Sequence, residues 1–221
     1  MNIQQQLNSP ATPDLPNPQD RYDRLTVAQT NAALRTFFLK AANIFTSLLG
    51  PRGGKFINMP YGAFQSSQIQ TVAAAATPTL VTVNTTDYAN GVSRVAGDGF
   101  HVEQDGIYNI QFSAQLTNND TQSHEIDIWL RKGTNGGAAT DLAGTASVST
   151  ISSTHGGQLG YVIIAANFFV ELKSTEFVEF WWAASSTLVQ LDALPAITTP
   201  FASPAAPSFV ATLTFVSNLQ A

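Results

Sequence analysis

Cysteine is absent from this chain of 221 residues, and charged side chains are scarce. Without cysteine there are no disulfides and no thiolate metal ligands, so stability must come from buried apolar area and from assembly. Lys, Arg, Asp and Glu make up only 11% of the residues, whereas about a quarter is usual in a soluble domain. This depletion is typical of a neutral β-protein surface, or of a surface largely covered in an assembly. Composition alone leaves both alternatives open.

The chain also lacks a run of about 20 apolar residues, the length that crosses a bilayer. Its N-terminus does not show the basic-then-apolar pattern of a signal peptide. Ten Lys and Arg stand against fifteen Asp and Glu, and the basic residues are scattered rather than gathered into a stripe that could follow phosphates. We therefore expect neither a membrane nor nucleic acid as a partner.

No constellation of residues indicates catalysis. No two histidines have the spacing of metal ligands, and no Gly-x-Ser-x-Gly nucleophile elbow is present. Three glutamates, Glu171, Glu176 and Glu179, bracket one hairpin and resemble an acid–base pair, but solvated strand positions explain them better. We expect no catalytic residues, no metal site and no cofactor.

Residues 1–25 are predicted to form an extended arm. Pro10, Pro13, Pro16 and Pro18 stand there among Asn, Gln and Asp. Such a composition buries too little apolar area to offset the entropy of the chain. A segment of this kind can reach across a neighbouring surface, and we interpret it as part of an attachment device.

Residues 26–58 are predicted to be an amphipathic helix and a turn. From Thr26 to Leu49 apolar residues recur at helical spacing, with Asp23 or Thr26 available as the N-cap and Gly50-Pro51 as the end. The side chains predicted to make the attachment are Val27, Leu34, Phe38, Phe45 and Leu48. The same spacing fits three heptads, so the helix could equally form a self-associating stalk or dock on a neighbouring protein or on its own sandwich.

Residues 59–221 are predicted to be an all-β sandwich. In residues 106–116 apolar and polar residues alternate, the period of a half-buried strand. Further runs predict strands at 79–83, 99–103, 125–131, 159–166, 168–172, 176–184 and 208–216. Many short strands with no second helix favour a sandwich or jelly roll.

Four segments resemble the C1q and tumour-necrosis-factor-like jelly rolls. GIYNIQFSAQL, residues 106–116, matches the Gly-x-Tyr-x-x-x-Phe strand of that family, and HEIDIWLRKG, residues 124–133, resembles the strand that follows. Residues 168–182 sit where the family has its Leu-x-x-Gly-Asp-x-Val hairpin, although Lys173, Ser174 and Thr175 replace the Gly-Asp pair. Residues 207–216 resemble the closing strand. The resemblance implies a jelly roll that assembles as a tight homotrimer through one face of each sandwich.

Aromatic residues occur on both faces of two predicted strands. Trp129, Phe177 and Trp181 point away from the face that carries the aliphatic residues, and a two-layer sandwich buries only one face of each strand. We therefore predict that these three residues form the subunit interface. The alternative is that loops or the N-terminal helix cover them.

The layout of arm, helix and sandwich resembles that of jelly-roll structural proteins of tailed bacteriophages. It implies a virion protein, and we expect a trimeric capsid decoration or cement protein whose partners are itself and the major capsid protein. The alternative is a tail-fibre or receptor-binding tip, with loops 132–137 and 152–157 recognising host-surface glycans. An enzyme that acts on polysaccharide ranks last.

Overall fold

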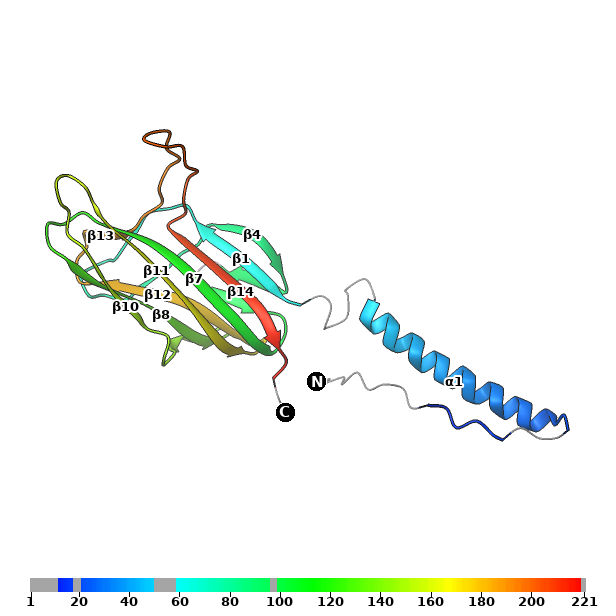
Figure 1. Cartoon of the computed structure of the whole chain (residues 1–221). Helices are drawn as coiled ribbons and strands as arrows, with labels where there is room; N and C mark the ends of the chain where they lie inside the picture. The colour runs from blue at the N-terminus through cyan, green and yellow to red at the C-terminus, as the bar shows by residue number, and fades with distance from the viewer. Residues whose placement is uncertain (1–11, 18–20, 50–58, 96–98, 220–221) are drawn as a thin grey trace. The chain divides into compact units, whose positions relative to one another are not determined.

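The computed structural model describes residues 12–17, 21–49, 59–95 and 99–219, without the side chains of residues 47–49. The chain divides into two compact units, Met1–Met59 and Pro60–Ala221. The described helix belongs to the first unit and the described strands to the second (Figure 1). Most of the predicted arm and the turn at residues 50–58 lie outside the described residues.

Helix α1 (Arg24–Leu49) begins at a cap that Asp23 provides. The Asp23 carboxylate accepts hydrogen bonds from the backbone N–H groups of Leu25 and Thr26, at 3.2 and 3.0 Å, and from the Thr26 hydroxyl at 2.7 Å. These bonds, with the Thr26 hydroxyl first, hold the pKa of Asp23 below its ordinary value. Asp23 is thus the N-cap, and the helix begins at Arg24 rather than at Thr26.

The second unit consists of two sheets of seven strands each. The β7 sheet contains β2 (Gln70–Thr71), β13 (Val189–Leu191), β7 (Gly106–Asn118), β14 (Phe209–Ser217), β1 (Tyr61–Ser66), β4 (Thr85–Asn90) and β11 (Gly160–Leu172). The β8 sheet contains β10 (Ser147–Ile151), β8 (His124–Thr134), β12 (Glu176–Ala184), β6 (Gly99–Val102), β5 (Val92–Val95), β3 (Thr79–Leu80) and β9 (Thr140–Asp141).

The antiparallel pairs are nested along the chain. Strand β1 pairs with β14, β6 with β12, β7 with β11 and β8 with β10. Successive pairs fall alternately in the β7 sheet and in the β8 sheet, as though one long hairpin had been rolled up. This nested order is the topology of a jelly roll. The prediction of an all-β jelly-roll sandwich preceded by one α-helix is therefore confirmed.

Three phenylalanines join the two sheets across the core. Phe112 and Phe209, neighbours in the β7 sheet, stack with ring centroids 5.8 Å apart. Phe180 of the β8 sheet packs edge-on against both, at 5.6 and 5.1 Å. All three side chains are buried, and edge-to-face pairs of this kind add to the stabilisation that burial provides. The inward-facing residues of both sheets surround this cluster.

Two of the predicted strand boundaries are wrong. Residues 159–166 and 168–172 were expected as separate strands, yet β11 runs unbroken because Asn167 occupies an outward, exposed position that keeps the alternation. The predicted strand at 79–83 is reduced to β3, two residues that pair with Trp181 and Trp182. Seven strands were not predicted, because tertiary pairing outweighs their weak local pattern: β1, β2, β4, β5, β9, β10 and β13.

Candidate functional site

The outer face of the β8 sheet carries the predicted interface residues. Trp129 and Trp181 lie directly opposite each other on β8 and β12. The Arg131 guanidinium lies 3.9 Å from the centroid of the Trp181 ring and 5.9 Å from that of Trp129. Such cation–π contacts are favourable and cover the faces of the rings.

Two carboxylates bind the indole N–H groups of these tryptophans. The Asp141 carboxylate on β9 accepts a hydrogen bond from Trp129 Nε1 at 2.7 Å and another from Arg131 Nε at 2.6 Å. The bond from Arg131, followed by the bond from Trp129, lowers the pKa of Asp141. On β12 the buried Glu179 carboxylate accepts a hydrogen bond from Trp181 Nε1 at 2.7 Å. Both indole N–H groups are therefore satisfied within one copy of the chain.

The burial of Phe177 contradicts its predicted place in the subunit interface. Its side chain is only 4% exposed, because its ring stacks on His101 at 5.4 Å and covers Gly133, where an added Cβ would lie 2.6 Å from the ring. Phe177 thus has almost no surface left for a subunit contact. Trp129 and Trp181 stay half-buried, so the interface assigned to them remains a prediction, although contacts within one copy already cover part of each ring.

The outer face of the β7 sheet has the opposite character. Glu171 is the only charged residue in β1, β7, β11 and β14, all of which lie in the described part of the chain. Ile163 and Phe169 project outward from β11 and are 64% and 67% exposed. Tyr161 on β11, Tyr61 on β1 and Val216 on β14 are also exposed on this face. Glu171 is exposed near the C-terminal end of β11, and we call the other outward-facing residues of these four strands the uncharged face.

Strand β11 is also the edge of its sheet. Over all 13 of its residues it pairs with β7, and among the described residues no other strand pairs with it. Natural edge strands are usually protected by Lys, Pro, a bulge or shortness. Strand β11 is long, has neither Lys nor Pro, and pairs with β7 without a shift in register. Its edge and its outward apolar residues therefore form one continuous unprotected region.

Helix α1 keeps several predicted attachment residues accessible. Val27, Phe38 and Phe45 are exposed, and Leu34 is half-buried. The side chain of Leu48 lies outside the described residues. Among the described helices, none is both long and apolar enough to span a bilayer. The helix thus presents apolar side chains that the described part of its own unit leaves uncovered.

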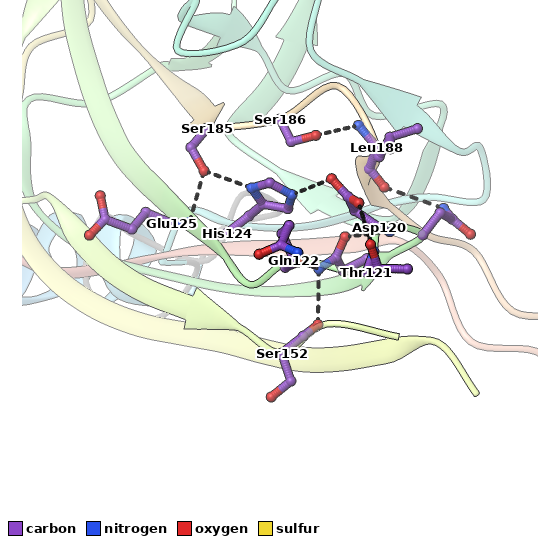
Figure 2. A network of polar contacts seen from close by, with 11 residues as sticks. Asp120, Thr121, Gln122, His124, Glu125, Ser152, Ser185, Ser186 and Leu188 are labelled. Carbon is purple, nitrogen blue, oxygen red and sulfur yellow. Dashed lines mark hydrogen bonds and ion pairs between the residues drawn. The ribbon is translucent and has the colours of Figure 1, made fainter. Parts of the chain in front are cut away.

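A polar network ties together three loops at one end of the sandwich (Figure 2). His124 Nε2 lies 2.8 Å from an Asp120 carboxylate oxygen, and His124 Nδ1 lies 3.1 Å from the Ser185 hydroxyl. The side-chain amide of the buried Asn118 donates to the backbone oxygens of Gln122 and Ser152, at 2.8 and 2.9 Å. The loops after β7, β10 and β12 are thereby joined.

Ser185, His124 and Asp120 are the residue types of a hydrolytic triad, but their surroundings favour a structural latch. The Ser185 oxygen also accepts the backbone N–H of Glu125 at 3.1 Å, which draws electron density away from a nucleophile. The nearby N–H groups of Asn119, Thr121 and Leu188 donate to partners within these loops instead of pointing at a site for an oxyanion. The sequence pattern does not reveal this network, because Ser185 is 61 residues from His124.

The other candidate groups also have structural partners. Glu176 accepts hydrogen bonds from Lys132 Nζ at 3.3 Å and from the backbone N–H of Lys173 at 2.9 Å. Within the described residues, no cluster of three or more His, Asp and Glu side chains could hold a metal ion. A pocket of about 170 Å³ beside Glu179 is lined mainly by apolar residues, among them Leu80, Val83 and Phe100.

The two loops assigned to glycan recognition lie far apart. Residues 132–137 comprise the C-terminal end of β8 and the turn after it, whereas residues 152–157 adjoin the end network near His124, at the N-terminal end of β8. A strand of this length separates its ends by roughly 33 Å, at about 3.3 Å per residue. The loops therefore cannot form one glycan site within a single copy.

Replacing Arg131 with Met should uncover the two tryptophans. Loss of the cation–π contacts and of the bond to Asp141 should increase quenching of tryptophan fluorescence by acrylamide and lower the free energy of unfolding by about 1 kcal/mol. Lys132→Met, which breaks the nearby pair with Glu176, is the control and should leave quenching unchanged. Equal quenching in Arg131→Met and the unaltered protein would show that the cover comes from elsewhere.

Replacing Asp120 with Asn should destabilise the protein at neutral pH. The hydrogen bond from His124 lowers the pKa of Asp120, so the stabilisation is present above the ordinary Asp value of about 3.9 and is lost as the pH falls through the lowered value. Urea unfolding should separate Asp120→Asn from the unaltered protein at pH 6 but much less at pH 3. The exposed Glu103→Gln serves as the control, and a difference that persists at low pH would contradict the latch.

Comparisons with known proteins add a similarity of structure only. No family model matches the chain, and no curated protein matches it. Among solved structures, Eiger TNF from S. frugiperda is similar with a TM-score of 0.48 at 11% sequence identity. The similar region covers 74% of this chain and 96% of that one.

Proposed function

We propose that this chain is a structural protein that assembles with copies of itself through the uncharged face, as a trimeric capsid decoration protein of a tailed bacteriophage. The observation that carries the proposal is the unequal distribution of charge between the two outer faces. On the outer face of the β8 sheet, Arg131, Asp141 and Glu179 find their hydrogen-bond partners within one copy of the chain. The uncharged face has exposed Ile163 and Phe169 instead, and contiguous exposed apolar surface of this kind marks interaction sites.

A second copy fits this face better than a charged partner. The polar positions between the apolar residues are Asn, Gln, Ser and Thr, as in Gln111 and Ser113 on β7. Charged residues are depleted at the centres of protein interfaces, because each would lose its hydration there. The stoichiometry of three is what the resemblance of residues 106–116 to the C1q and tumour-necrosis-factor-like strand implies.

The first unit supplies the attachment in this proposal. A helix that leaves Val27, Phe38 and Phe45 exposed can lay an apolar stripe in a groove of a partner. A proline-rich arm adds contacts at low folding cost. The major capsid protein is the partner proposed for both segments. The alternative function is a receptor-binding tip, in which one of the two separate loop groups recognises a host-surface glycan.

A lysine at position 163 should dissociate the assembly. In Ile163→Lys or Phe169→Lys the interface would bury an unpaired charge, and the dissociation constant should rise on the order of 30-fold or more, or about 2 kcal/mol. Sedimentation equilibrium measures this. The matched control is Val148→Lys on β10, a position that is 71% exposed on the outer face of the β8 sheet.

Two outcomes would contradict this interface. If Val148→Lys dissociates the assembly and the β11 variants do not, the β8 sheet forms the contact, as Trp129 and Trp181 originally suggested. If the unaltered protein stays monomeric at high concentration, the assembly role itself is wrong. Circular dichroism and thermal unfolding establish that each variant is folded.

Removal of residues 2–24 should abolish binding to capsids that lack the protein but leave self-association intact. The arm and the sandwich belong to different compact units, so the loss should be specific to attachment. Phe38→Ser/Phe45→Ser should weaken capsid binding as well, whereas the exposed pair Arg35→Ser/Lys40→Ser on the same helix is the control. Co-sedimentation with capsids measures the binding.

Full decoration by the truncated protein would rule out the arm as the fastening. Labelled protein that binds host cells, and that host polysaccharide competes off, would favour the receptor-binding alternative. Binding to capsids without binding to cells would favour decoration.

A further inference from the structure

The connection between β13 and β14 stands away from both sheets (Figure 1). Residues 193–207, which we call the proline hairpin, contain four prolines and no charged residue. Two pairs of backbone hydrogen bonds, between Leu194 and Ala206 and between Ile197 and Ser203, hold its two sides together at 2.9 to 3.1 Å. The hairpin is therefore an ordered projection, although it belongs to neither sheet.

The base of the proline hairpin is fixed to the β7 sheet. The backbone N–H of Asp192 donates to Gln115 on β7, and that of Ser208 donates to Ser66 on β1, each at 2.8 Å. The Ser208 hydroxyl adds a bond to the backbone oxygen of Gln68 at 2.6 Å. Asp192 and Ser208 are both buried. The hairpin thus extends from the sheet that carries the uncharged face.

The tip of the proline hairpin is apolar and accessible. Phe201 is 66% exposed and Ile197 is also exposed. Prolines restrict the backbone before binding, so little conformational entropy is lost when the tip meets a partner. Residues 193–200 reach roughly 25 Å when extended, at about 3.3 Å per residue. This length is enough to cross onto an adjacent subunit.

The charge and the position of the proline hairpin together indicate which partner its tip contacts. The proline hairpin itself contains no Lys or Arg, so it has no positive charge with which to bind anionic lipid or nucleic acid. The proline hairpin and the uncharged face both lack charged residues, and strand β14 follows the hairpin directly. A copy docked on the uncharged face would lie beside the hairpin.

We propose that the proline hairpin is an exchange arm that packs its tip, with Phe201 at the centre, onto a neighbouring copy of this chain. The inference rests on the proposed self-assembly and adds a second, separate contact to it. The uncharged face supplies the broad contact between sandwiches. The hairpin reaches over the boundary and holds the neighbour.

The first test shortens the hairpin. Replacing residues 195–205 with Asn-Gly joins Leu194 to Ala206, an antiparallel bonded pair, through a two-residue turn. The sandwich should keep its far-ultraviolet circular dichroism and its unfolding transition, while the dissociation constant of the assembly rises by about tenfold or more. Phe201→Ser should give a smaller rise in the same direction, and Phe201→Leu should restore most of the affinity.

The second test locates the tip. The chain has no cysteine, so Phe201→Cys accepts a single benzophenone maleimide, and Thr150→Cys on the outer face of the β8 sheet is the matched control. After irradiation of mixed ¹⁵N-labelled and unlabelled chains, crosslinks from position 201 should join labelled to unlabelled peptides. Position 150 should give few crosslinks between copies.

The outcomes separate the two proposals. If the unaltered protein assembles and Ile163→Lys dissociates it, but the hairpin variants assemble normally and position 201 crosslinks only within its own chain, the exchange arm is wrong and the uncharged face stands. If the unaltered protein does not assemble and position 201 gives no crosslinks between copies, both proposals fail. A weaker assembly of the shortened variant together with mixed-label crosslinks supports the arm.

Discussion

The packing of Phe180 against Phe112 and Phe209 is the contact on which the sandwich depends, because it holds the two sheets together at the centre. Once the inner faces are buried, the alternation of side chains along each strand fixes which residues point outward. The residues of the outer faces are thus fixed by which residues the core buries. Their chemistry, however, differs sharply between the two sheets.

On the outer face of the β8 sheet, charged and aromatic side chains contact one another within a single chain. Arg131 lies over Trp181 and bonds to Asp141, and Glu179 receives the indole N–H of Trp181. The β7 sheet has no comparable set of ionic contacts among its long strands, where Glu171 is the only charge. Among the strands of the two sheets, the charged residues are therefore concentrated in the β8 sheet, and this asymmetry favours the use of the other sheet for assembly.

Local periodicity explains which elements could be predicted. Strand β7 alternates apolar and polar residues from Tyr108 to Leu116, and α1 repeats apolar residues at helical spacing, so each pattern needs no distant partner. Strands β4 and β5 lack such a pattern and exist because neighbouring strands supply their hydrogen bonds. The end network was beyond prediction for a related reason, since Ser185 reaches His124 only after β8 and β12 have paired.

The sequence by itself determined that Trp129, Phe177 and Trp181 point away from the core, because alternation along a strand is a local property. Only the tertiary structure decided what covers them. The covering residues, Arg131, Asp141 and His101, lie on strands that strand pairing brings together. In the same way, the sequence gives β11 its apolar residues, but the order of strands in the sheet leaves that strand at an open edge.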